Sequence, residues 1–151
     1  SAGFCLIASA KRDQMRLITV VMGTPSDNAR MNDSQALLNY GFRFYSTHRL
    51  YGAGDTVTEA PVWMGKVNRI GLSLNKDLYI TVPRGQYEAV KTQAEVQDRL
   101  AAPLAADAPI GKVVVRFNDD PLLEAPLYPQ QAVEKGNLFK RLWHWLLMWF
   151  K

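Results

Sequence analysis

Apolar and polar positions at the start of the chain follow the pattern of two β-strands joined by a turn. Residues 4–8 (FCLIA) and 17–21 (LITVV) are mostly apolar residues of types that favour β-strands, and they flank the polar residues 11–14. This pattern predicts a β-hairpin over residues 3–22. Because both runs are continuously apolar, we expect strands that are covered on both faces.

The pattern changes to helical spacing after residues 23–26, which break the second strand. Ser26 or Asp27 is a suitable N-cap for the helix that follows. We expect this helix to end near Tyr45, because small and apolar residues recur on one helical face; they are Ala29, Ala36, Leu37, Tyr40, Gly41 and Phe44. Two strands and one helix need packing partners that this chain does not supply, so we expect it to be a fragment.

From about Arg49 onwards, short β-rich stretches alternate with turn residues and prolines. Residues 75–77 and 118–120 fit hairpin turns. The pattern predicts a small antiparallel β-sandwich over residues 48–132. Its expected strands are residues 57–64, 69–74, 78–82, 87–100, 112–117 and 122–127, and its expected core is Val62, Ile70, Leu72, Leu78, Ile80, Val96, Val113 and Val115.

The last stretch, LFKRLWHWLLMWFK over residues 138–151, is the most apolar part of the chain. Asn137 can cap a helix to Lys151 of roughly 22 Å, which is too short for a hydrocarbon core of about 30 Å. Basic residues gather on one narrow stripe, and tryptophan at this density favours the headgroup boundary.

We therefore predict that residues 133–151 contain an amphipathic helix that lies in the membrane interface. The alternative is a terminal helix that docks on the protein's own core or in a dimer. The predicted anchor residues are Leu138, Phe139, Leu142, Trp143, Trp145, Leu146, Trp149 and Phe150.

Composition narrows the classes of function. The chain has 151 residues, a net charge of +4 and no Lys/Arg block outside the tail, so nucleic acid is not an expected partner. The single cysteine excludes a disulfide within the chain, and two histidines with one thiol cannot build a zinc site at these separations. We therefore expect no metal and no cofactor, and no signal peptide is recognisable.

Two short motifs match those of penicillin-recognising serine enzymes. Residues 73–76 match Ser-x-x-Lys and residues 26–28 match Ser-Asp-Asn. The first falls at a predicted strand end and the second at a predicted helix cap, in reversed order and without Lys-Thr-Gly, so we interpret both as coincidences. Cys5 is expected to be a buried, inert thiol, and His48 and His144 to be surface residues.

The order of segments nevertheless resembles one enzyme family. Residues 1–45 (SAGFCLIASAKRDQMRLITVVMGTPSDNARMNDSQALLNYGFRFY) resemble the end of the catalytic domain of serine-type D-alanyl-D-alanine carboxypeptidases. These are the low-molecular-mass penicillin-binding proteins of the bacterial periplasm, peptidase family S11. Residues 76–85 (KDLYITVPRG) resemble that family's β-rich second domain, and the tail resembles its amphipathic anchor.

The resemblance implies a mainly β chain. Residues 1–47 would be the last hairpin and helix of an α/β penicillin-binding catalytic domain, followed by the β-sandwich and the anchor helix. The family's Ser-x-x-Lys, Ser-x-Asn and Lys-Thr-Gly motifs are absent, so we expect no catalytic residue in this chain and no activity from it alone. Arg30 matches the arginine that helps to hold the terminal carboxylate of the substrate, whereas the residues alone also allow a salt bridge to Asp27 or Asp33.

The whole protein is thus expected to trim peptidoglycan pentapeptides through an acyl-serine intermediate, at the periplasmic face of the inner membrane. Its expected partners are the pentapeptide, the membrane surface and proteins that bind the sandwich. The alternative is a non-catalytic, membrane-associated module that binds peptidoglycan or protein partners.

Overall fold

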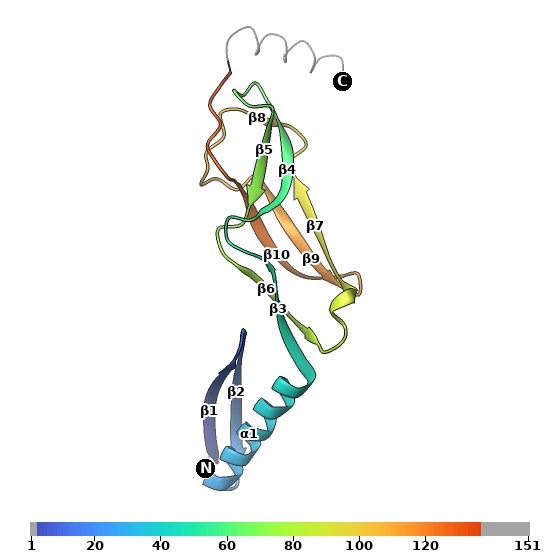
Figure 1. Ribbon diagram of the computed structural model, residues 1–151. Helices are drawn as coiled ribbons and strands as arrows, with labels where there is room; N and C mark the ends of the chain where they lie inside the picture. Colours follow the sequence, from blue (N-terminus) through green and yellow to red (C-terminus); the bar gives the residue numbers. More distant parts are fainter. Residues whose placement is uncertain (1–2, 137–151) are drawn as a thin grey trace. The chain divides into compact units, whose positions relative to one another are not determined.

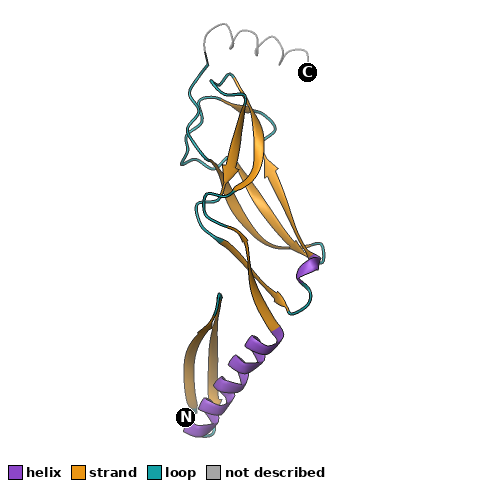
Figure 2. Cartoon of the chain, viewed as in Figure 1, coloured by secondary structure: helices purple, strands orange, loops and turns teal. Residues whose placement is uncertain are grey.

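The computed structural model describes residues 3–136, which divide into two compact units (Figure 1). Of the described residues, the first unit contains 3–48 and 79–88, and the second contains 49–78 and 89–136. Strands dominate both units, and the described residues contain one α-helix (Figure 2). The prediction of a mainly β chain is therefore confirmed, whereas the predicted terminal helix lies outside the described residues.

The first unit is built on a hairpin and a helix. β1 (Phe4–Arg12) pairs antiparallel with β2 (Met15–Thr24), and α1 (Asp27–Phe44) packs on one face of the pair. Ser26 caps the helix, because its hydroxyl accepts a hydrogen bond from the backbone N–H of Ala29 at 3.1 Å. The predicted hairpin and helix are confirmed.

The face of the hairpin opposite α1 is apolar and exposed. Ile7, Ile18, Val20 and Met22 are each more than half exposed. Cys5 lies on the same face of β1 as Ile7, two residues away, and is also exposed. The prediction of a buried thiol is therefore wrong, because α1 covers only the other face of these apolar strands.

A separate two-stranded sheet pairs β3 (Tyr45–Tyr51) with β6 (Leu78–Pro83). The hydroxyl groups of Thr47 and Thr81 meet across it at 2.8 Å. β3 follows α1 without a break and was missed from the sequence. Because β6 pairs with β3, the predicted hairpin at residues 75–77, which would pair β6 with β5, is wrong.

The second unit holds one six-stranded sheet in the order β7-β9-β10-β5-β4-β8. β4 and β8 pair in parallel and the other neighbours are antiparallel, so the sheet is mixed. A single mixed sheet thus replaces the predicted antiparallel sandwich. The strands are β4 (Thr56–Trp63), β5 (Arg69–Ser73), β7 (Val90–Val96), β8 (Leu100–Ala101), β9 (Gly111–Phe117) and β10 (Asp120–Pro129).

The sheet must curl strongly. β7 and β8 are its two outermost strands, yet only residues 97–99 separate them in the sequence. A link this short spans about 14 Å at most, so the two edges approach each other. The single strand predicted over residues 87–100 is therefore wrong: a 3₁₀ turn (Tyr87–Ala89), β7 and β8 replace it.

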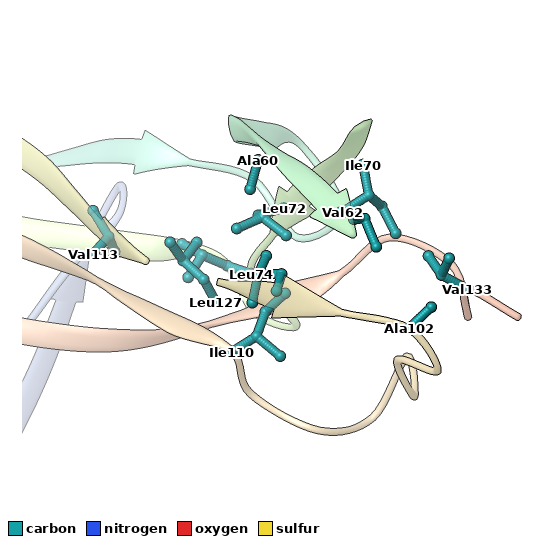
Figure 3. Packing of buried hydrophobic residues seen from close by; sticks show 11 residues of the cluster. Ala60, Val62, Ile70, Leu72, Leu74, Ala102, Ile110, Val113, Leu127 and Val133 are labelled. Carbon is teal, nitrogen blue, oxygen red and sulfur yellow. The ribbon is translucent and has the colours of Figure 1, made fainter. Parts of the chain in front are cut away.

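The concave side of this sheet holds the main hydrophobic core (Figure 3). Leu72, Val113 and Leu127 are fully buried in it. Of the predicted core, Val62, Ile70, Leu72 and Val113 belong to the cluster, Leu78 and Val96 pack against it, and Ile80 and Val115 are buried elsewhere. The alternating strand pattern thus identified buried positions well.

Candidate functional site

Arg30 lies near the start of α1, where the Ser26 cap fixes the first turn. Its Nη1 donates a hydrogen bond of 2.8 Å to the carbonyl oxygen of Cys5 on β1, and its Nη2 forms an ion pair with Asp27. The guanidinium carbon lies 6.0 Å from the ring centre of Phe4. The fold therefore ties this arginine to the start of β1.

The guanidinium keeps donors that these contacts do not use. An arginine has five N–H groups, and the two contacts above engage two of them. Nε is buried and has no hydrogen-bond partner in the described structure, while the side chain as a whole is one-third exposed. The predicted salt bridge to Asp27 is confirmed, and a role for Arg30 in carboxylate binding stays a prediction.

The structure shows where the two motif matches, residues 73–76 and residues 26–28, lie in the fold. Ser73 ends β5 and is buried, and Lys76 lies in the turn that follows. A nucleophilic Ser-x-x-Lys needs a helix start to bring the lysine beside the hydroxyl, and this pair has none. Ser26 caps α1.

The side chain of His48 is half-buried, so it is less exposed than the predicted surface position. Its Nε2 lies 2.9 Å from the hydroxyl of Ser46, and its ring stacks on Tyr87 at 4.3 Å between ring centres. These contacts tie β3 to the 3₁₀ turn that follows β6. His144 lies outside the described residues.

A charged cluster on the convex face of the sheet was missed from the sequence. Lys112 on β9 lies 2.8 Å from Glu124 on β10 and 3.6 Å from Glu95 on β7. The hydrogen bond to Glu124, followed by the charges of both acids, raises the pKa of Lys112. An open groove of about 710 Å³ lies beside this cluster, between Pro109 and Pro126.

Two exposed carboxylates are also perturbed by lysine partners. The hydrogen bond from Lys91 lowers the pKa of Asp119, and the hydrogen bond from Lys66 lowers the pKa of Glu134. Exposed pairs of this kind contribute little to stability.

Neither a metal cluster nor a membrane-crossing helix occurs in the part of the chain that the structure describes. Residues 3–136 hold no group of three or more acidic, histidine or cysteine side chains arranged to bind a metal ion. No helix among them is both long and apolar enough to cross a membrane. The predicted anchor residues, from Leu138 to Phe150, lie outside the described residues.

Comparisons with known proteins agree on one family. The family described as "Penicillin-binding protein 5, C-terminal domain" matches residues 45–135. The chain is 37% identical over 99% of its length to a D-alanyl-D-alanine carboxypeptidase, DacA, of Haemophilus influenzae, and 34% identical over 99% to DacC of Escherichia coli.

A solved structure supports the same relationship. Penicillin-binding protein 5 of Haemophilus influenzae superposes with a TM-score of 0.82 at 36% identity, over 89% of this chain and 40% of that one. The chain spans 39% and 38% of the lengths of the two carboxypeptidases. The chain belongs to the family of C-terminal domains of low-molecular-mass penicillin-binding proteins, the D-alanyl-D-alanine carboxypeptidases.

Proposed function

We propose that this chain is the C-terminal part of a D-alanyl-D-alanine carboxypeptidase that removes the terminal D-alanine from peptidoglycan pentapeptides. The observation that carries the proposal is the alignment of relatives with that name over 99% of this chain, including the hairpin and α1. The acyl-serine chemistry would come from the remainder of the protein. This chain would contribute one arginine, the tail, and the second unit (residues 49–78 and 89–136), which we call the β-rich unit.

The apolar outer face of the hairpin supports a larger catalytic domain. Four large apolar side chains stand exposed there: Ile7, Ile18, Val20 and Met22. Exposed clusters of this kind are rare on complete soluble domains. We propose that the remainder of the catalytic domain covers this face.

Arg30 is the residue of this chain that would bind substrate. A guanidinium is always charged, and its fork matches the geometry of a carboxylate. We propose that the terminal carboxylate of the peptide takes up N–H donors that Cys5 and Asp27 leave unused. In this role Arg30 positions the substrate and transfers no proton.

A labelled β-lactam separates the whole protein from this chain. The full-length protein is expected to be acylated stoichiometrically, whereas residues 1–151 alone are expected to remain unlabelled. Their match to Ser-x-x-Lys, residues 73–76, lies at a strand end rather than at the helix start that a nucleophilic serine of this family needs. Gel fluorescence after labelling measures both. Labelling of Ser73, or of any other serine in this chain, would contradict the proposal.

Replacing Arg30 with alanine in the full-length protein tests its role. One charged hydrogen-bond pair is lost, so kcat/KM for carboxylate-ended peptides is expected to fall by the equivalent of about 1.5–3 kcal/mol. Arg43→Ala is the matched control, since Arg43 lies in the last turn of the same helix and contacts the Phe44 ring. Unchanged kinetics with lowered stability would mean that Arg30 serves only its contacts with Asp27 and Cys5.

We further propose that the tail holds the protein on the periplasmic face of the inner membrane. The support is the sequence of residues 138–151, which combines tryptophan and leucine with a basic stripe.

A further inference from the structure

A cleft opens along one edge of β10 in the second unit. β10 pairs with β5 only at Tyr128–Ser73 and Pro129–Leu72, because β5 ends at Ser73. The chain then turns away through residues 74–78. A cleft of about 440 Å³ remains between this turn and β10.

The walls of this β10 cleft are mostly apolar. Leu74 and Leu78 line it from the turn, and Ala125, Pro126 and Tyr128 line it from β10. Because successive side chains of a strand point to opposite faces, Ala125 and Pro126 can both line the cleft only if it opens at the edge of the strand. Its volume falls within the range of about 300–1,000 Å³ that is typical of small-molecule sites, and such sites are also lined mostly by apolar side chains.

The backbone of β10 offers hydrogen-bonding groups to this cleft. The backbone N–H of Gln130 donates to the carbonyl oxygen of Gly71 at 3.0 Å, so every second residue before it also faces the β5 side. The backbone of Pro126, which lines the cleft, therefore points to this side, where β5 has ended. Among the described residues no strand pairs with Pro126 on that side, and it can offer only its carbonyl oxygen.

The cleft has one uncompensated charge, at Lys76. Asp77, its neighbour, accepts hydrogen bonds from the backbone N–H of Ala53 at 2.8 Å and from Arg49 at 3.3 Å, so its charge is already balanced. Lys76 is exposed and takes part in none of the ion pairs found within residues 3–136. The lining thus combines an apolar wall, a carbonyl acceptor and a free ammonium group.

We propose that the β10 cleft binds the apolar C-terminal residue of a partner protein. The side chain of that residue packs between Leu74, Leu78 and Ala125. Its backbone N–H donates to the carbonyl oxygen of Pro126, and its terminal carboxylate pairs with Lys76. This inference rests on the β-rich unit alone and does not depend on the catalytic proposal.

The test is a titration of the full chain, labelled with ¹⁵N, with acetyl-Gly-Ala-Leu as the free acid and as the C-terminal amide. Chemical-shift changes are expected at residues 74–78 and 124–128. The acid is expected to bind about two- to fivefold more tightly than the amide, because only the acid offers a charged partner to the exposed Lys76. Equal affinities, or shift changes confined to other residues, would overturn the proposal.

Two matched variants test whether Lys76 causes the difference in affinity between the acid and the amide. Lys76→Gln is expected to abolish the difference between acid and amide, whereas Lys91→Gln, an exposed lysine on β7, is expected to preserve it. Lys76 lies in an exposed turn, so its replacement leaves the core untouched. An acetylated D-alanyl-D-alanine peptide is the competing ligand: if it binds here more tightly than the L-peptide acid, the partner is not a protein terminus and the proposal fails.

Discussion

Replacing Leu127 with alanine is expected to lower the free energy of unfolding of the β-rich unit by about 2–5 kcal/mol. Leu127 lies on β10, is fully buried and belongs to the main core cluster. The substitution removes three carbon atoms from a site with contacts on all sides, and strands β9 and β5 hold the backbone in place. Urea unfolding of the full chain, followed by far-ultraviolet circular dichroism, measures the loss.

Leu122→Ala is the matched control, because Leu122 lies on the same strand and is 50% exposed. Its effect is expected to stay within about 0.5 kcal/mol. Comparable losses from the two substitutions would mean that the interior of the curled sheet is not the stabilising core. A change in the denaturant dependence of the Leu127 variant, rather than in its midpoint, would point to an altered unfolded state.

Local signals in the sequence predicted the elements that depend on neighbouring residues. Ser26 directly precedes α1, and its hydroxyl accepts a hydrogen bond from the backbone N–H of Ala29, so the cap could be predicted without tertiary structure. Asn118 and Asp119 adopt positive φ angles of 51° and 69° in the turn between β9 and β10. These residue types tolerate that conformation, which is why this hairpin was predicted correctly.

Pairing between distant strands could not be predicted from the same signals. β6 follows β5 after a good turn sequence, yet it pairs with β3, some thirty residues earlier in the chain. β8 has two residues and pairs in parallel with β4. Such choices depend on how the whole sheet closes, and the pattern of apolar residues is the same for either partner.

The ion pairs also include one that the sequence predicts and others that it cannot predict. The pair of Arg30 and Asp27 is three residues apart on one helix, so spacing alone predicts it. Lys112 meets Glu95 and Glu124 only because three strands lie side by side, and the register cannot be read from the sequence. The β10 cleft is equally nonlocal, since it exists where β5 stops and β10 continues.

Deleting residues 138–151 is expected to release the protein from anionic membranes. The predicted helix would bury Trp143, Trp145 and Trp149 at headgroup depth, and apolar burial contributes about 25 cal/mol per Å². Lys140, Arg141 and Lys151 would each add up to about 1 kcal/mol near an anionic surface. Co-sedimentation with phosphatidylglycerol vesicles, at two salt concentrations, measures binding of the full and the shortened chain.

The β-rich unit is expected to stay folded after this deletion, because its last described contacts precede the cut. Val133 is buried in the main core, and the backbone N–H of Gly136 donates to the carbonyl oxygen of Met64 at 2.7 Å. The triple substitution Leu142→Ser, Leu146→Ser and Trp149→Ser is expected to abolish membrane binding as the deletion does. Lys140→Gln is expected only to reduce the salt dependence of binding. If the full chain stays in the supernatant, or if the deletion unfolds the β-rich unit, the tail belongs to the protein's own core and the membrane proposal is wrong.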